Sequence, residues 1–593
     1  MDTQIILTII FCIIVFLYMT QLLALEITSI LILPVLALCC PYMTTADIFS
    51  GISSPATITI ICMFILSAGM LKSGALEPLS NYLSKQAKKG YINFLLHLAV
   101  FVPIISALIN NTPLVVMLVP VVLAVARENS IMPSKLLIPL SYFSILGGTF
   151  TLIGTNTNIL VNQLYIDMTG KSGFSMFEFS PMGSVYMIIG LVFIMTIGLK
   201  LLPSRTSLSA ILGKSSTAKY VTELSITKKS PLCGKSIEEA FTKDSKIRVL
   251  QVIRNEEIYA LSKLKEIELQ ADDDLIIEAS VDNITKYLGS HLDLPENAKT
   301  DNKLKLQSMK VMIDEAVVLP DSKFVGATLE SLKFSRNFGA VVLGIQRGGR
   351  HHKRFIASME VRAGDLLLLQ SDQDGFDRLR DTGDVLLLDK PVASNKSKKN
   401  AYLSLLIMAL VIGGATFTSI PLVILAIIGC AAMFLLKIID MNEGFGAIDS
   451  KVILLLVGAI PLGAAMQKSG LAQLIADTLL GLTNGMPNWV VLSMFYLLTS
   501  LLAEIVSNKA TAVMLTPIAI QFAATLGVDP KPFLMAICFG ASASFMTPIG
   551  YATNTIVMGP GGYKYVDYLK IGIPLNILMW IIATILIPIF YPF

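Results

Sequence analysis

The chain has 593 residues, of which 54% are hydrophobic and only 15% are charged, and its formal net charge is +4. A soluble core cannot bury so much apolar surface, so the composition excludes an ordinary soluble domain and predicts a polytopic membrane protein. The basic residues are scattered along the chain, which argues against a nucleic-acid-binding protein.

Apolar stretches recur along the first 203 residues. The first of them has no basic segment ahead of it and is too long for the apolar core of a signal peptide, so we expect a retained helix. The apolar spans of this part are 5–24, 27–42, 55–72, 92–108, 114–127, 134–152 and 183–203.

The polarity changes abruptly at about residue 204, and the chain stays charged up to about residue 398. This insert is duplicated: LCGKSIEEAF at 232–241 matches FVGATLESLKF at 324–334, and DDDLIIEAS at 272–280 matches AGDLLLLQS at 363–371. Short apolar runs that alternate with turn residues are typical of strands. We therefore predict two soluble α+β modules, residues 204–300 and 301–398.

Apolar spans resume after the insert, so the chain is predicted to consist of a membrane half (1–203), the insert, and a second membrane half (399–593). The spans of the second half are 401–417, 420–438, 451–467, 488–506, 512–526, 531–547 and 570–591.

The two membrane halves repeat each other at an offset of 396 or 397 residues. The matching pairs are MLKSGALEPLSNYL (70–83) with MQKSGLAQLIADTL (466–479), NNTPLVVMLVP (110–120) with SNKATAVMLTP (507–517), and TLIGTNTN (151–158) with TPIGYATN (547–554). An internal repeat that is interrupted at corresponding places is the sequence signature of a secondary transporter, and inverted halves would each make an odd number of crossings.

Each half is punctured twice by polar residues, at 110–113 and 154–158 in the first half and at 507–511 and 550–554 in the second. Unwound backbone inside a membrane is tolerated where it lines a cavity or is buried in protein. Freed carbonyls and Asn or Thr oxygens suit a hard cation, and the exposed helix N-termini favour an anion. The pattern predicts two cation sites beside one anion site. The alternative is that these polar residues only join helices by hydrogen bonds.

The punctured motifs, together with KSGALEPL at 72–79, resemble the divalent anion/sodium symporter family over nearly all of the membrane sequence. The resemblance implies an α-helical fold of two inverted repeats, each with a re-entrant helical hairpin. It also implies a dimeric scaffold, elevator-type motion, and transport of sulfate or of di- and tricarboxylates with sodium.

Carried onto this chain, the resemblance implies two groups of site residues. The expected sodium ligands are Asn110, Asn111, Gly154 and Asn158 in the first half and Ser507, Asn508, Gly550 and Asn554 in the second. The expected substrate-binding residues are Asn111, Thr112, Asn508, Lys509 and Thr511. We expect one or two transported sodium ions and no organic cofactor.

Lys509 departs from the family pattern, which has a small hydroxyl residue at this position. It is a tethered cation that pairs with the anion and weakens the dependence on a second sodium, or a titrating group that admits proton coupling, or a lysine that snorkels to water. Glu504 lies three residues before the second motif and is expected either to pair with Lys509 or to stay near water. Lys72 and Lys468 are interpreted as interfacial anchors.

The duplicated insert resembles the TrkA-C (RCK-C) domain over about 211–390, which implies a small-molecule or nucleotide ligand; the alternative is a dimerisation or stabilising appendage without a ligand. Basic segments such as SKQAKKG at 84–90 and SNKSKKN at 394–400 indicate that the insert is cytosolic. We expect a homodimer in the plasma membrane, surrounded by lipid.

The favoured function is therefore a sodium-coupled carrier of a small inorganic or carboxylate anion, with sulfate first and dicarboxylates second. A ligand-gated ion channel or potassium-handling protein is the alternative, although no glycine-rich selectivity filter is visible. An intramembrane enzyme is disfavoured because the apolar spans hold almost no His, Asp or Glu apart from Glu504.

Overall fold

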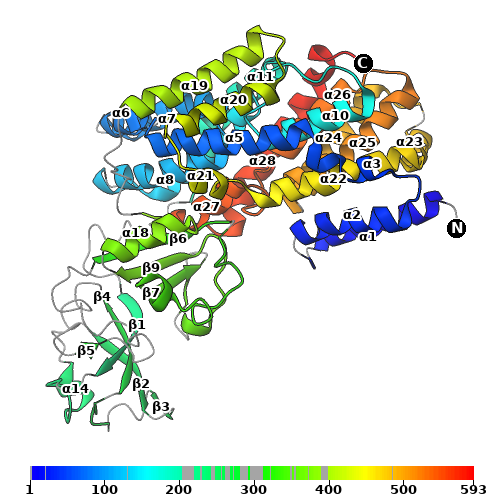
Figure 1. The fold of residues 1–593 in the computed structure, drawn as a ribbon. Helices are drawn as coiled ribbons and strands as arrows, with labels where there is room; N and C mark the ends of the chain where they lie inside the picture. The colour runs from blue at the N-terminus through cyan, green and yellow to red at the C-terminus, as the bar shows by residue number, and fades with distance from the viewer. Residues whose placement is uncertain are drawn as a thin grey trace.

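The computed structural model is a bundle of apolar helices with two small β-sheets attached to it (Figure 1). The residues that the structure describes are 3–20, 22–23, 25–75, 77–87, 89–129, 131–203, 219–226, 230–241, 247–254, 257–260, 267–271, 273–280, 292–293, 312–320, 322–347, 350–352, 356–371, 373–388, 398–483, 485–505 and 507–593.

The first half of the bundle is a series of helices that are interrupted where the sequence is polar. They are α1 (Thr3–Thr20), α2 (Leu25–Cys39), α3 (Thr45–Ile48), α4 (Ser50–Ser53), α5 (Pro55–Ser73), α6 (Glu77–Ala87), α7 (Tyr91–Ser106), α8 (Asn111–Glu128), α9 (Leu137–Gly148), α10 (Asn156–Thr169), α11 (Ser180–Phe193) and α12 (Leu199–Leu201). A π-helical turn, Ile194–Gly198, joins the last two.

The second half has helices in the same order and at nearly the same spacing. They are α19 (Lys398–Phe417), α20 (Leu422–Leu435), α21 (Met441–Gly446), α22 (Ser450–Lys468), α23 (Leu471–Leu482), α24 (Asn488–Ile505), α25 (Asn508–Leu526), α26 (Lys531–Ser542), α27 (Ala552–Gly561) and α28 (Tyr565–Phe590). Thus α5 corresponds to α22, α8 to α25 and α10 to α27.

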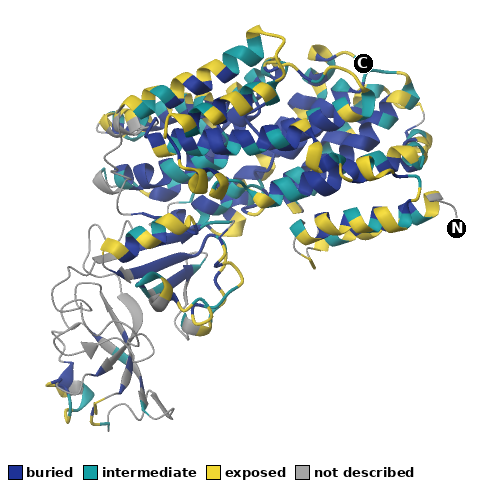
Figure 2. Cartoon of the chain, in the orientation of Figure 1, coloured by how far each residue is buried: buried dark blue, intermediate teal, exposed yellow. Residues whose placement is uncertain are grey.

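Seven helices within the described residues are long and apolar enough to cross a membrane, and the bundle also contains shorter apolar helices. The seven are 55–73, 180–201, 399–417, 450–468, 488–505, 508–526 and 565–590. Buried residues concentrate on the inward faces of the bundle, whereas its outer faces expose large apolar side chains (Figure 2). Such a surface suits lipid contact, and the chain is a multi-pass membrane protein.

The halves exchange helices. The first-half helix α5 packs against α19, α20 and α21 of the second half, while α22 packs against α2, α3 and α4 of the first. Each exchange ends in an ion pair. Lys72, at the end of α5, binds Glu443 of α21, and Lys468, at the end of α22, binds Asp47 of α3 at 2.6 Å.

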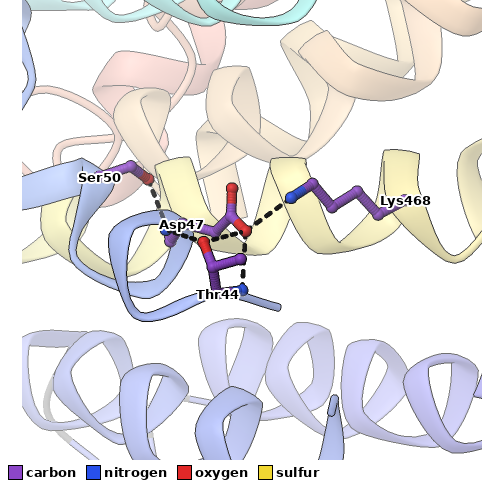
Figure 3. Close-up of polar contacts among 4 residues, drawn as sticks. All are labelled: Thr44, Asp47, Ser50 and Lys468. Carbon is purple, nitrogen blue, oxygen red and sulfur yellow. Dashed lines mark hydrogen bonds and ion pairs between the residues drawn. The ribbon is translucent and has the colours of Figure 1, made fainter. Parts of the chain in front are cut away.

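Figure 3 shows the second of these pairs, in which Asp47 also receives hydrogen bonds from the backbone and hydroxyl of Thr44. The Lys468 ammonium, with help from these bonds, lowers the pKa of Asp47 from its usual 3.8 to about 2. The two lysines, predicted as interfacial anchors, therefore also join the halves to each other.

The insert contains two five-stranded antiparallel sheets with the same strand order. The strands of the first sheet, β3-β2-β4-β1-β5, are β1 (Lys219–Ile226), β2 (Arg248–Arg254), β3 (Glu257–Ala260), β4 (Asp274–Ser280) and β5 (Leu292–Asp293). Those of the second, β10-β6-β9-β7-β8, are β6 (Met312–Val318), β7 (Val341–Arg347), β8 (Arg350–His352), β9 (Leu366–Ser371) and β10 (Val385–Leu387).

Short helices accompany each sheet: α14 (Ile237–Ala240) in the first module, and α17 (Phe334–Phe338) and α18 (Gln373–Thr382) in the second. An equivalent buried ion pair also stabilises each module, Arg254–Asp273 and Arg347–Asp365. The second sheet lies between the helical bundle and the first sheet (Figure 1), because β6 contacts α27 and β7 contacts β1. The TrkA-C resemblance of these modules stays a prediction.

Candidate functional site

Both halves break their helices at the predicted polar motifs. In the first half α7 ends at Ser106 and α8 begins at Asn111, and in the second half α24 ends at Ile505 and α25 begins at Asn508. We call Asn110–Asn111 the first tip and Ser507–Asn508 the second tip. The other motifs form the start of α10 and of α27, each preceded by a non-helical loop: the first loop is 149–155 and the second loop is 543–551.

In each half, the segment just before the tip forms a hydrogen bond with the loop, and the two bonds occupy corresponding positions. The hydroxyl of Thr151 donates to the carbonyl of Ala107, and the hydroxyl of Thr547 lies 3.2 Å from the carbonyl of Glu504 at the corresponding position. The amide nitrogens of Gly154 and Gly550 donate to these two hydroxyls, at 3.1 and 2.9 Å. The repeat therefore extends to individual contacts.

The asparagines that follow the loops close them in the same way. Asn158 Nδ2 donates to the Thr151 carbonyl at 3.0 Å, and Asn554 Nδ2 donates to the Thr547 carbonyl at 3.1 Å. Both side chains are buried. Their first role is thus to hold the loop backbone in a fixed shape.

At the first tip, Asn111 is fully buried and both ends of its amide are bound. Its Oδ1 receives the Ser106 hydroxyl, and its Nδ2 donates to the hydroxyl of Tyr551 at 2.6 Å. The end of α9 has no room for a side chain here, because a Cβ on Gly148 would lie 2.6 Å from Asn111 Oδ1. Asn110 and Thr112 flank Asn111 and are only half-buried.

Tyr551 was not among the predicted site residues, yet it connects the two halves. It belongs to the second loop, and its hydroxyl lies 2.6 Å from Asn111 at the first tip and 3.4 Å from Thr155 Oγ1 in the first loop. An aromatic residue within the polar motif TPIGYATN, where the first half has Thr155, could have marked this position as a site residue from the sequence.

Ser141 of α9 makes a second connection between the halves. It donates to Asn554 Oδ1 at 2.7 Å. Through the hydrogen bonds of Tyr551 and Ser141, the two tips and the two loops form a single connected polar cluster.

At the second tip, Asn508 Oδ1 receives the Ser544 hydroxyl at 2.9 Å. Thr511 lies one turn into α25, and its hydroxyl is buried without a hydrogen-bond partner among the described residues. Ser507 precedes the helix without capping it through its side chain. The start of α25 therefore lacks a side-chain cap and lies beside an unpaired hydroxyl.

Glu504 is the buried carboxylate of this cluster, at the position where the first half has Ala107. It accepts hydrogen bonds from Met546 N at 2.7 Å, the Thr547 hydroxyl at 2.7 Å and Asn576 Nδ2 at 3.3 Å. Both sequence expectations for Glu504 were wrong, since it neither pairs with Lys509 nor lies near water; it holds the second loop instead.

Lys509 binds Asp449, the residue before α22, with Nζ 3.1 Å from Oδ2. Its side chain is partly buried, at 31% exposed. Its role toward an anion stays a prediction.

The cluster is rich in oxygen atoms and in helix N-termini but poor in classical metal ligands. Among the described residues, no group of three or more His, Cys, Asp or Glu side chains is arranged to hold a metal ion. Amide, hydroxyl and carbonyl oxygens such as those of Asn111, Ala107 and Asn508 suit a weakly held hard cation.

Several known proteins are similar to this chain over most of its length. The model of the citrate transporter family (CitMHS) matches residues 6–530 and 408–593. An uncharacterized transporter of Synechocystis sp. is 35% identical over 573 residues, covering 95% of this chain and 93% of the relative. Sodium/sulfate cotransporter 1 of Chlamydomonas reinhardtii is 21% identical and covers 91% and 84%. Among solved structures, the YdaH transporter of Alcanivorax borkumensis matches at 14% identity with a TM-score of 0.43, covering 93% and 89%.

Proposed function

We propose that this chain, which belongs to the citrate transporter family, is a secondary active transporter of small divalent anions and that its transport is coupled to sodium. Sulfate is the first substrate and dicarboxylates are the second. The anion binds at the second tip, through Asn508, Thr511 and the amides at the start of α25, with Asn111 and Thr112 of the first tip opposite.

The observation that carries this proposal is the buried, unpartnered hydroxyl of Thr511. Helical threonines normally donate to the carbonyl four residues earlier, as Thr516 does to Ala512 at 2.6 Å. Thr511 departs from this pattern, because its buried hydroxyl has no hydrogen-bond partner among the described residues, although the Ser507 carbonyl accepts the Thr511 amide. A buried hydroxyl without a partner costs about 1–3 kcal/mol. An oxyanion bound at the uncapped helix start would accept it.

Sodium coupling is supported by the uncharged oxygen atoms at the tips and loops and by the name of the Chlamydomonas relative. Each tip and loop brings together uncharged oxygens, and hard monovalent cations bind such oxygens reversibly. The proposed ligands are Asn110, Asn111, Gly154 and Asn158 for one ion and Ser507, Asn508, Gly550 and Asn554 for the other. The Chlamydomonas relative is named a sodium/sulfate cotransporter.

The wider architecture belongs to the same proposal. Residues 1–203 and 399–593 act as inverted repeats with re-entrant hairpins in an elevator-type homodimer in the plasma membrane. The modules 204–300 and 301–398 are cytosolic and bind a regulatory ligand. A ligand-gated channel is not favoured, because the family model that matches the chain and the Synechocystis relative are both of transporters.

Uptake of labelled sulfate, succinate and citrate into proteoliposomes, under a sodium or a potassium gradient, tests the proposal. We expect sodium-driven uptake, and Thr511→Val should raise the KM for sulfate about tenfold, because it removes a hydrogen bond to a charged ligand.

The matched control is Thr516→Val, on the same helix, whose hydroxyl bonds only within the helix. It should leave the KM unchanged. Absence of uptake of every anion under every gradient would overturn the function, and equal KM values for the two variants would overturn the site.

A further inference from the structure

The ion pair between Lys509 and Asp449 joins the second tip to the start of another helix. Lys509 is the second residue of α25, directly after Asn508. Asp449 precedes α22, and α22 and α25 pack against each other. The side chains are 31% and 19% exposed, so the pair is partly shielded from water and from salt.

The two oxygens of Asp449 have separate partners. Oδ1 accepts the Lys451 amide at 3.1 Å and caps α22, whereas Oδ2 lies 3.1 Å from Lys509 Nζ. Capping occupies Oδ1 and leaves Oδ2 for the lysine. The corresponding first-half helix, α5, is capped by a neutral residue, Ser54, which accepts the Ala56 amide at 3.2 Å.

The first half also lacks the lysine, because Thr112 occupies the position that corresponds to Lys509. The second half therefore contains an added cation and an added anion that bind each other, at the tip where the helix start is uncapped and the Thr511 hydroxyl is unpaired. The negative charge of Asp449 suits the start of α22, and it also neutralises Lys509 through the second carboxylate oxygen.

We propose that Asp449 is an internal counter-anion of Lys509 that the transported anion must displace, so that Asp449 lowers the affinity of the site for anions. This inference rests on the proposed function of the second tip. When the site is empty, the Asp449 carboxylate neutralises the Lys509 ammonium, so that no uncompensated positive charge lies beside Asn508. When an anion binds, the ammonium turns from Asp449 to the anion, and when the anion leaves, Asp449 recaptures it.

The mechanism gives Asp449 the role of a positioning residue that acts through Lys509. Because the pair keeps part of its contact with water, it can be broken and re-formed at moderate cost. Transport requires release as well as capture, and a competing internal anion speeds release.

Equilibrium binding of labelled sulfate to the purified full-length chain, together with uptake into proteoliposomes, tests this proposal. In Asp449→Asn, sulfate should bind about three- to tenfold more tightly, because the substitution removes the carboxylate charge that competes with sulfate for Lys509. The KM should fall in parallel while the maximal rate stays level or declines. Asp449→Glu should restore the wild-type affinity. Lys509→Thr should weaken binding about tenfold.

The double variant Asp449→Asn with Lys509→Thr should behave like Lys509→Thr alone, because Asp449 acts only through the lysine. Asp47→Asn is the matched control: Asp47 forms a comparable ion pair with Lys468, side chains 23% and 43% exposed, and belongs to neither tip. Its removal should not change sulfate affinity.

The outcomes separate this proposal from the proposed function. If wild type transports sulfate but Asp449→Asn binds it no more tightly, the counter-anion role is wrong and the transporter stands. If wild type does not transport, yet Asp449→Asn gains sulfate binding that needs Lys509, the counter-anion role stands and the transport function fails. If neither protein binds sulfate or a dicarboxylate, both are overturned.

Discussion

Tyr551 is the residue on which the unity of the candidate site depends. Its hydroxyl accepts a hydrogen bond from Asn111 across 440 positions of sequence, and it lies beside Thr155. Because Asn111 is fully buried, the loss of this acceptor leaves an amide nitrogen unsatisfied.

Tyr551→Phe is therefore expected to raise the KM for sulfate about fivefold and to weaken sodium activation, since a net hydrogen bond is worth about 1 kcal/mol. Kinetics of uptake at varied sodium and sulfate measure both effects. Tyr186→Phe is the control: Tyr186 is also fully buried and bonds a tyrosine hydroxyl, that of Tyr496, but away from the tips. Unaltered kinetics in Tyr551→Phe would contradict a shared site.

The charged residues at the second tip could be predicted from the sequence, but their partners could not. A lysine beside a polar motif in an apolar run predicted an unusual cation, and that much follows from the cost of burying a charge. Its partner Asp449 lies 60 residues away at a helix start, and no periodicity of the sequence points to it. Glu504 likewise binds the loop around Thr547, which is far from it in the chain.

The helices and their breaks, by contrast, followed closely from the sequence. Apolar runs and polar punctures at a constant offset predicted breaks at 110–113 and 507–511, with apolar spans resuming at 114 and 512, and the structure begins α8 and α25 three and four residues earlier, at Asn111 and Asn508. Such features are local, since an apolar stretch becomes a helix in a membrane and a polar break ends it. The contacts between the breaks depend on tertiary packing, which a single sequence does not display.

At the scale of elements, the second soluble module packs directly on α27, the helix that starts at the second loop. Leu366 and Leu368 of β9 belong to the same apolar core as the membrane helices. The contact is close, because a Cβ added to Gly559 of α27 would lie 2.3 Å from the carbonyl oxygen of Gly364. This contact is a route by which a ligand of the modules would affect the second loop.

Gly559→Ala should push this module away from α27, because a methyl group has no room against backbone. Hydrogen–deuterium exchange of residues 361–371 should rise about tenfold, which corresponds to an overpacking cost of about 1–3 kcal/mol. Gly413→Ala in α19, where an added Cβ would meet no atom within 4 Å, is the control. If exchange is unchanged in Gly559→Ala, the docking described here is not maintained in solution.

At the scale of the whole molecule, the halves are interlocked instead of merely adjacent. α5 is packed among second-half helices and α22 among first-half helices, and each exchange is closed by an ion pair at Glu443 or Asp47. Neither half buries its exchanged helix alone, so we expect the two to fold together. The tips and loops, linked by Tyr551 and Ser141, then form one site that both halves must complete.

Equilibrium binding of labelled sulfate to the purified chain with and without sodium tests this central claim most directly. The composite site predicts that sodium tightens sulfate binding, and that Asn111→Ala and Asn508→Ala, one in each half, each abolish the effect of sodium. Sulfate binding that is indifferent to sodium, or sensitive to only one of the two asparagines, would contradict a single site built by both halves.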